Sequence, residues 1–210
     1  AGSATLERLF HRRNLTLFMV LTGGCIGLLA LMSDFGTAAI FFVTFLVIAY
    51  LRSGDFATLG LICGGAAFGA GLVLKFKPYI LSRFASWGHA WQNTTSGAGY
   101  QQSRTMSAAA SGGLVGVGAG NGWLHRVGAG DTDLVFGMIA EEWGLLIAIL
   151  AVLSIVTLAV FAARSGRSGR SSYYTIAGCA AASLMVFQTC LNVFGATDLL
   201  PLTGVTFPFV

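Results

Sequence analysis

The 210-residue chain is 55% hydrophobic and only 10% charged, and it contains 29 glycines. This composition excludes a soluble globular protein and predicts a polytopic membrane protein. The net charge of +4 does not call for nucleic acid, and no nucleic-acid partner is expected, because positive residues gather in the cytoplasmic loops of membrane proteins. The four cysteines lie in apolar runs without C-x-x-C spacing. Their positions therefore indicate neither a metal site nor a disulfide framework.

Five apolar runs have about the length that a membrane-crossing helix needs. They cover residues 15–32, 36–51, 57–74, 134–163 and 173–195. Short loops at residues 52–56 and 164–172 connect two pairs of them, and a long polar stretch, residues 75–133, separates the third from the fourth. We therefore expect one all-α membrane domain over residues 1–210. It has about five transmembrane helices and one long loop.

The arginines predict the orientation of these helices. With the N-terminus inside, the cytoplasmic side collects Arg8, Arg12, Arg13, Arg52, Arg164, Arg167 and Arg170 against Glu7 and Asp55. This is the arrangement that the positive-inside rule favours. The loop of residues 75–133 is then extracytoplasmic, and we expect it to follow the membrane surface through short helices before residues 112–122 turn it back. Trp87 and Trp91 suit the lipid–water boundary.

Residues 128–144 form a polar, Gly-rich loop that becomes an apolar run. One interpretation is structural: Asp131 and Thr132 cap a helix and Asp133 favours its first turn. The other is functional, because Glu141 and Glu142 lie inside an expected membrane helix, where ionisable groups are costly and usually functional. If the helix is continuous, small residues line up beneath Asp133. They are Gly137, Ala140 and Gly144.

Four segments carry a resemblance to a known family. The first reads Asp34-Phe35-Gly36-Thr37-Ala38, and the second reads Gly99-Tyr100-Gln101-Gln102-Ser103 with Ser111-Gly112-Gly113-Leu114 and Gly116-Val117-Gly118-Ala119-Gly120-Asn121. The third reads Thr132-Asp133 with Ala140-Glu141-Glu142-Trp143-Gly144. The fourth consists of Phe187-Gln188, Asn192 and Leu199-Leu200-Pro201-Leu202-Thr203-Gly204. In this order they resemble the SEDS proteins of bacterial cell-wall synthesis, the FtsW, RodA and SpoVE group. The resemblance covers roughly the C-terminal half of a fold of about ten transmembrane helices. A fragment is therefore expected, and this fragment is not expected to be active by itself.

The resemblance implies a peptidoglycan glycosyltransferase of the bacterial cytoplasmic membrane, which polymerises lipid II at the outer face during division, elongation or sporulation. A class B penicillin-binding protein is the implied partner, alongside lipid II and membrane lipid. No cofactor is expected, and a divalent cation is left open. Asp133 matches the family's essential aspartate, whose chemical task would be that of a general base.

The other candidate residues keep two interpretations each. Glu141 and Glu142 either support the site or pair with other helices. Arg104 either contacts phosphate or is solvated. Gln102 and Ser103, in the second segment, complete the substrate-binding candidates. Asp34 and Asp198 border short turns, which they either cap or join to the site.

Two other functions also fit a membrane chain with acidic residues and many glycines. A flippase or transporter would place acids along a pathway, but its site would lie near mid-membrane, whereas Asp133 is expected at the outer boundary. A non-catalytic scaffold for a partner is the third possibility.

Overall fold

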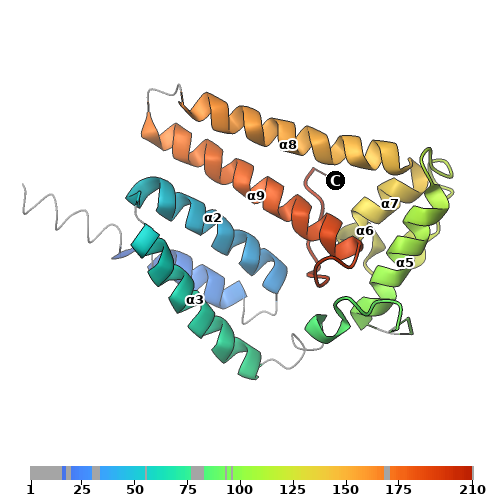
Figure 1. Ribbon diagram of the computed structural model, residues 1–210, viewed down its shortest axis with the longest axis horizontal. Helices are drawn as coiled ribbons and strands as arrows, with labels where there is room; N and C mark the ends of the chain where they lie inside the picture. The colour runs from blue at the N-terminus through green and yellow to red at the C-terminus, as the bar shows by residue number, and fades with distance from the viewer. Residues whose placement is uncertain are drawn as a thin grey trace, which may run out of the picture.

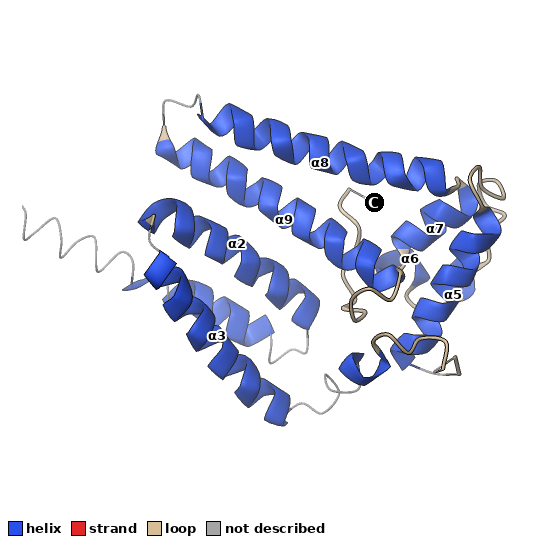
Figure 2. Cartoon of the chain, viewed as in Figure 1, coloured by secondary structure: helices blue, strands red, loops and turns tan. Residues whose placement is uncertain are grey.

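The computed structural model describes residues 16–17, 20–29, 34–54, 56–76, 83–92, 94–95, 97–167 and 171–209. The expected basic N-terminal segment lies outside these residues, as do parts of the first apolar run and of both short loops. The described part is helical and contains no strand (Figure 2). Its named elements are α2 (Phe35–Ser53), α3 (Phe56–Phe76), α5 (Gly97–Gly112), η1 (Leu124–Arg126), α6 (Gly130–Asp133), α7 (Val135–Glu142), α8 (Leu145–Arg167) and α9 (Ser172–Ala196).

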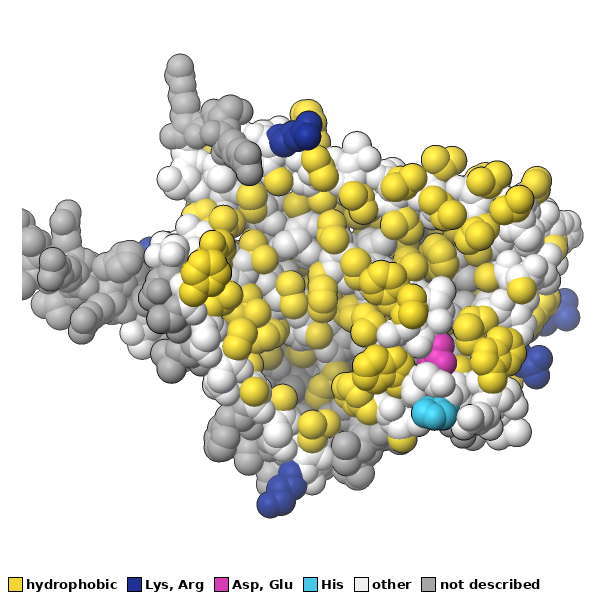
Figure 3. Space-filling view, in the orientation of Figure 1, with side chains coloured by type: hydrophobic (Ala, Val, Ile, Leu, Met, Phe, Trp, Pro, Cys, Tyr) yellow, Lys and Arg dark blue, Asp and Glu magenta, His cyan; other side chains and the backbone are white. Residues whose placement is uncertain are grey.

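Three helices are long and apolar enough to cross a membrane: α2, residues 145–165 of α8, and α9. They lie side by side, with α9 packed between α8 and α2 (Figure 1). α3 packs against α2 at the place of the expected third span, and the helix Val20–Leu29 lies within the expected first span. The chain is therefore a multi-pass membrane protein. Hydrophobic side chains spread over the face in Figure 3, while Lys and Arg lie at its edges.

The prediction of one continuous helix over residues 134–163 is wrong. Leu134 has φ −113° and ψ 20°, so α6 ends at Asp133 and α7 starts afresh at Val135. A second break follows α7, where Gly144 has φ +88°, a conformation that side chains other than glycine rarely adopt. A Cβ atom at Gly144 would overlap the backbone of residues 114–116. Gly137, Ala140 and Gly144 therefore do not form one line below Asp133.

The long polar stretch contains the 16-residue helix α5. α5 packs against α7, and the two run across the end of the α8–α9 pair (Figure 1). Their backbones meet at Gly112, where a Cβ atom would overlap the backbone of Ala140 and Glu141. The chain then turns through residues 113–122. A helix followed by a turn agrees with the expectation for this stretch, whereas its position at the membrane surface stays a prediction.

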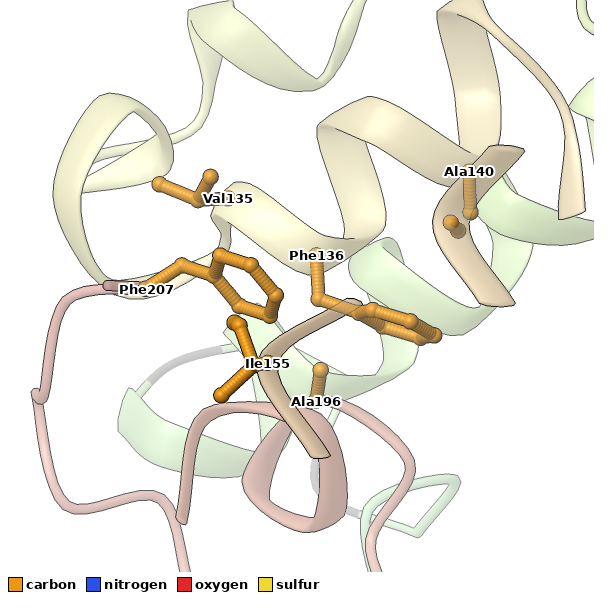
Figure 4. Packing of buried hydrophobic residues seen from close by; sticks show 7 residues of the cluster. Val135, Phe136, Ala140, Ile155, Ala196 and Phe207 are labelled. Atoms are coloured by element: carbon orange, nitrogen blue, oxygen red, sulfur yellow. The ribbon is translucent and has the colours of Figure 1, made fainter. Parts of the chain in front are cut away.

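The last described residues, 197–209, fold back over the bundle as a tail without helix. Phe207 joins Val135, Phe136, Ile155 and Ala196 in a buried cluster built from α7, α8, α9 and the tail (Figure 4). Val205 packs with Ile40 of α2 and Leu191 of α9. Burial of such a side chain stabilises a folded protein in water by about 1.5–3 kcal/mol. The gain is smaller for a side chain that would otherwise contact lipid, because lipid is itself apolar. Close packing of Phe207 and Val205 therefore fixes the tail against the helices.

Candidate active site around Asp133

Asp133 is partly exposed at the end of α6, where the polar loop meets the bundle. Its backbone N–H donates to the Ala129 carbonyl at 2.9 Å. Its own carbonyl accepts a hydrogen bond of 3.0 Å from Asn192 Nδ2. Within the described part of the chain, the hydrogen bonds of Asp133 use its backbone and leave the carboxylate oxygens available. The side chain is thus held in place through the main chain.

The capping interpretation of this region is wrong in its details. Helix α6 begins after Ala129, which has φ +62° and makes no side-chain cap. Thr132 Oγ1 instead donates to the Ala129 carbonyl at 3.3 Å. Leu134 precedes α7, which also has no side-chain cap. Neither Asp131 nor Thr132 therefore caps a helix, and only the expectation of acidic residues in the first turn is met.

Gly204 of the tail lies against Asp133. A Cβ atom built on Gly204 would be 3.2 Å from Asp133 Oδ2 and 3.7 Å from Arg83 Nη1. Arg83 Nη1 also donates to the Leu202 carbonyl at 2.7 Å. A carboxylate oxygen and a guanidinium nitrogen thus both lie within 4 Å of the place that a Gly204 side chain would occupy. No sequence motif indicated that Arg83 lies near this place, because 50 residues of sequence separate it from Asp133.

Asn192 is the buried residue that joins the three segments of the site. Its Nδ2 donates to the carbonyls of Asp133, at 3.0 Å, and Val205, at 2.7 Å. Its Oδ1 accepts from the Phe136 backbone N–H at 3.3 Å. One side chain of α9 therefore satisfies backbone groups at the α6–α7 break and in the tail. Buried polar groups need such partners.

The carboxylates of Asp198 and Asp34 both accept hydrogen bonds from backbone N–H groups. Asp198 Oδ1 and Oδ2 accept from the backbone N–H groups of Gly88, at 3.0 Å, and Ala90, at 3.2 Å. Trp87 Nε1 adds a bond of 3.0 Å to the Leu199 carbonyl. Residues 83–92 are thereby attached to the tail, which brings Arg83 to the site. Asp34 caps α2, since its Oδ1 accepts from the Thr37 N–H at 3.1 Å.

Glu141 and Glu142 both hold the glycine-rich loop after α5. The buried Glu141 carboxylate accepts from the backbone N–H groups of Trp123, at 2.9 Å, and Leu124, at 3.1 Å. Glu142 Oε2 accepts from the Gly120 N–H at 3.0 Å. These charge-assisted bonds stabilise the two carboxylates at the end of the apolar helix α7. A substrate-binding role for either glutamate stays a prediction.

The three remaining candidates lie on α5. Gln102 is fully buried, and its Nε2 donates to the carbonyls of Gly195, at 2.9 Å, and Leu200, at 3.1 Å. Ser103 Oγ donates to the Tyr100 carbonyl at 3.0 Å. Arg104 is exposed, with its guanidinium carbon 5.3 Å from the centre of the Tyr100 ring. The amide nitrogen of Gln102 and the hydroxyl of Ser103 thus bond within the protein, whereas the buried Gln102 Oε1 accepts no hydrogen bond within the described part of the chain and Arg104 faces outward. The contacts of these three residues with substrate stay predictions.

Among the described residues, no three His, Cys, Asp or Glu side chains gather as a metal site would require. The question of a divalent cation stays open at this site.

A family model described as "Cell cycle protein", for the FtsW, RodA and SpoVE group, matches residues 4–210. The chain belongs to this family. It is similar to "Probable peptidoglycan glycosyltransferase FtsW" of Coxiella burnetii, with 31% identity over 91% of the chain and 53% of that protein. "Stage V sporulation protein E" of Bacillus subtilis is 28% identical, over 84% of the chain and 49% of that protein.

The Mycobacterium bovis "Peptidoglycan glycosyltransferase RodA" is 28% identical over 88% of the chain and 39% of that protein. A solved structure described as "Structural coordination of polymerization and crosslinking by a peptidoglycan synthase complex" shares the fold, with a TM-score of 0.65 and 21% identity over 90% of the chain and 53% of that chain. The chain thus spans about half the length of the relatives it matches. The resemblance seen in the sequence motifs is confirmed as family membership.

Proposed function

We propose that the full-length protein is a peptidoglycan glycosyltransferase, which polymerises lipid II at the outer face of the bacterial cytoplasmic membrane. The names of the similar FtsW and RodA proteins support the reaction. The observation that supports the proposal is the arrangement around Gly204, where the carboxylate of Asp133 and the guanidinium of Arg83 each lie within 4 Å of the place that a side chain at Gly204 would occupy. A class B penicillin-binding protein is the proposed partner, in line with the crosslinking that the related complex is described as coordinating.

In the proposed reaction, Asp133 acts as the general base. A sugar hydroxyl of the acceptor loses its proton to an Asp133 carboxylate oxygen while its oxygen attacks the anomeric carbon of the donor. The bond from that carbon to the phosphate oxygen breaks, and the polyprenyl pyrophosphate leaves with the electron pair. General base catalysis typically contributes about 10²–10⁴ in rate. Arg83 brings a fixed positive charge that complements phosphate oxygens.

The test compares two substitutions in the purified full-length protein. Asp133→Asn keeps the size of the side chain and removes the base, so we expect glycan formation from lipid II to fall by about 10² or more. Asp131→Asn is the matched control, because Asp131 is exposed and two positions away. It should polymerise as the unaltered protein does, with both variants matched in melting temperature.

Near-normal polymer from Asp133→Asn would remove Asp133 from the mechanism. If the unaltered protein forms no polymer but translocates lipid II in vesicles, the flippase function replaces the proposed one. Absence of both activities would favour the scaffold.

A further inference from the structure

An exposed apolar surface lies where α5 and α7 meet, at the end away from Asp133. We call it the α5–α7 tip; it consists of Leu114, Val115, Val117 and Trp143. The side chains of Leu114, Val115 and Trp143 are 63%, 81% and 52% exposed. Residues 111–122 around the turn include no charged residue. Four neighbouring large side chains of this kind are an unusual surface for contact with water.

The backbone at the tip is largely self-satisfied. The N–H groups of Val117 and Gly118 donate to the carbonyls of Glu141 and Glu142, each at 3.0 Å. In return, the N–H groups of Leu145 and Leu146 donate to the carbonyls of residues 113 and 114, at 3.0 and 3.4 Å. Lipid cannot pair backbone groups, so a segment that enters it has to pair them internally. These bonds, with that from the Gly116 N–H to the Gly112 carbonyl at 2.8 Å, pair much of the backbone on both sides of the turn.

The same hydrogen bonds fix the level of the tip relative to the membrane. Leu145 is the first residue of α8 and of the membrane-crossing stretch 145–165. The exposed side chains of Leu146 and Leu150 continue the surface of the tip along this span. The tip is therefore at the boundary where α8 enters the lipid, on the α8 side of the bundle (Figure 1). Trp143 suits this boundary, since tryptophan is enriched there.

We infer that the α5–α7 tip inserts into the membrane interface, with the lipid leaflet beside the start of α8 as its partner. Leu114 and Val115 lie among the upper parts of the acyl chains and Trp143 lies at headgroup level. The tip then anchors the outer end of the α5–α7 pair, so that α7 is supported by lipid at its far end and by Asn192 at its near end. This inference rests on the fold and the apolar surface, and it does not depend on the role of Asp133.

The test uses a fluorescent reporter in the full-length protein, reconstituted in vesicles of phosphatidylcholine and phosphatidylglycerol. The native cysteines are replaced by alanine, and an environment-sensitive fluorophore is attached at Val115→Cys. The matched control carries it at His125→Cys, an exposed position of the same loop beside Arg126. We expect a blue-shifted emission at position 115 that lipids brominated near the headgroup quench and aqueous iodide does not. The control should show the opposite pattern.

A second variant tests whether the apolar side chains cause the insertion. With the fluorophore at Leu114→Cys, Val115→Asp should abolish bromolipid quenching, because a carboxylate resists entry into lipid. The side chain of Val115 is exposed, so this change leaves the folded protein intact, as an equal melting temperature in detergent would show. Iodide quenching at position 115 would overturn the inference, because the tip would then be in water. Resistance to both quenchers would also overturn it, because another protein surface would then cover the tip.

Discussion

Replacing Asn192 tests the connection that holds the candidate site together. The substitution Asn192→Leu keeps the volume of the side chain and removes three hydrogen bonds, to Asp133, Val205 and Phe136. Each such bond contributes about 0.5–1.5 kcal/mol net, so the expected loss is roughly 2–4 kcal/mol. The backbone groups left without partners at Phe136 and Val205 are buried and that at Asp133 is partly buried, which places the effect in the upper part of this range. Purified protein in detergent should therefore melt several degrees lower.

The control is the same substitution at an exposed asparagine. Asn121→Leu removes one hydrogen bond of 3.3 Å, to the Val117 carbonyl at the surface. Surface substitutions of this kind usually change stability by less than about 0.5 kcal/mol. Equal melting temperatures for the two variants would refute the assignment of Asn192 as the connecting residue. A lower melting temperature for Asn192→Leu alone would support it.

Two further predictions concern packing and orientation. Gly112→Ala should destabilise the protein by about 1–3 kcal/mol in thermal melts, because the added methyl group would overlap the Ala140 backbone and separate α5 from α7. The control is Gly178→Ala, where nothing lies within 4 Å of the added atom. This variant should be neutral or slightly stabilising. In a cysteine-free background, a membrane-impermeant maleimide added to intact cells should label Thr95→Cys and spare Ser172→Cys. Labelling of only the second position would reverse the predicted orientation.

Span boundaries were predictable because length and hydropathy largely determine them. The expected runs 36–51, 57–74 and 173–195 lie within α2, α3 and α9. The fourth run failed for a physical reason: hydropathy measures how apolar a stretch is, whereas its breaks depend on backbone conformation. Gly144 was the available signal, but a glycine with φ +88° and one packed inside a helix look alike in a sequence.

The motif indicated Asp133 as the candidate base, which stays a prediction, whereas its surroundings could not be read from the sequence. Arg83 lies near Gly204 because Asp198 attaches residues 83–92 to the tail. This connection joins distant segments and leaves no periodic pattern in the sequence. Glu141 illustrates the opposite difficulty, since an acid in an apolar run suggests function. Here its carboxylate accepts two backbone N–H groups from the loop before α6. Only the folded contacts show this structural task of Glu141, and a part in substrate binding stays a prediction.

The tail that packs on α2 has a consequence for biosynthesis. A Cβ atom at Gly36 would overlap Val205 and would lie 2.8 Å from the Thr203 carbonyl, so one of the first described helices and the last described residues form a single contact. Because Gly36 and Thr203 are 167 positions apart in the sequence (203 − 36), the ribosome delivers the two segments well apart in time. Helices α2, α8 and α9 can enter the membrane during translation, but Asp133 acquires Gly204 as a neighbour only after residue 204 has emerged. Nascent chains that end before residue 204 therefore carry an incomplete candidate site, and its completion is a late, post-insertional event.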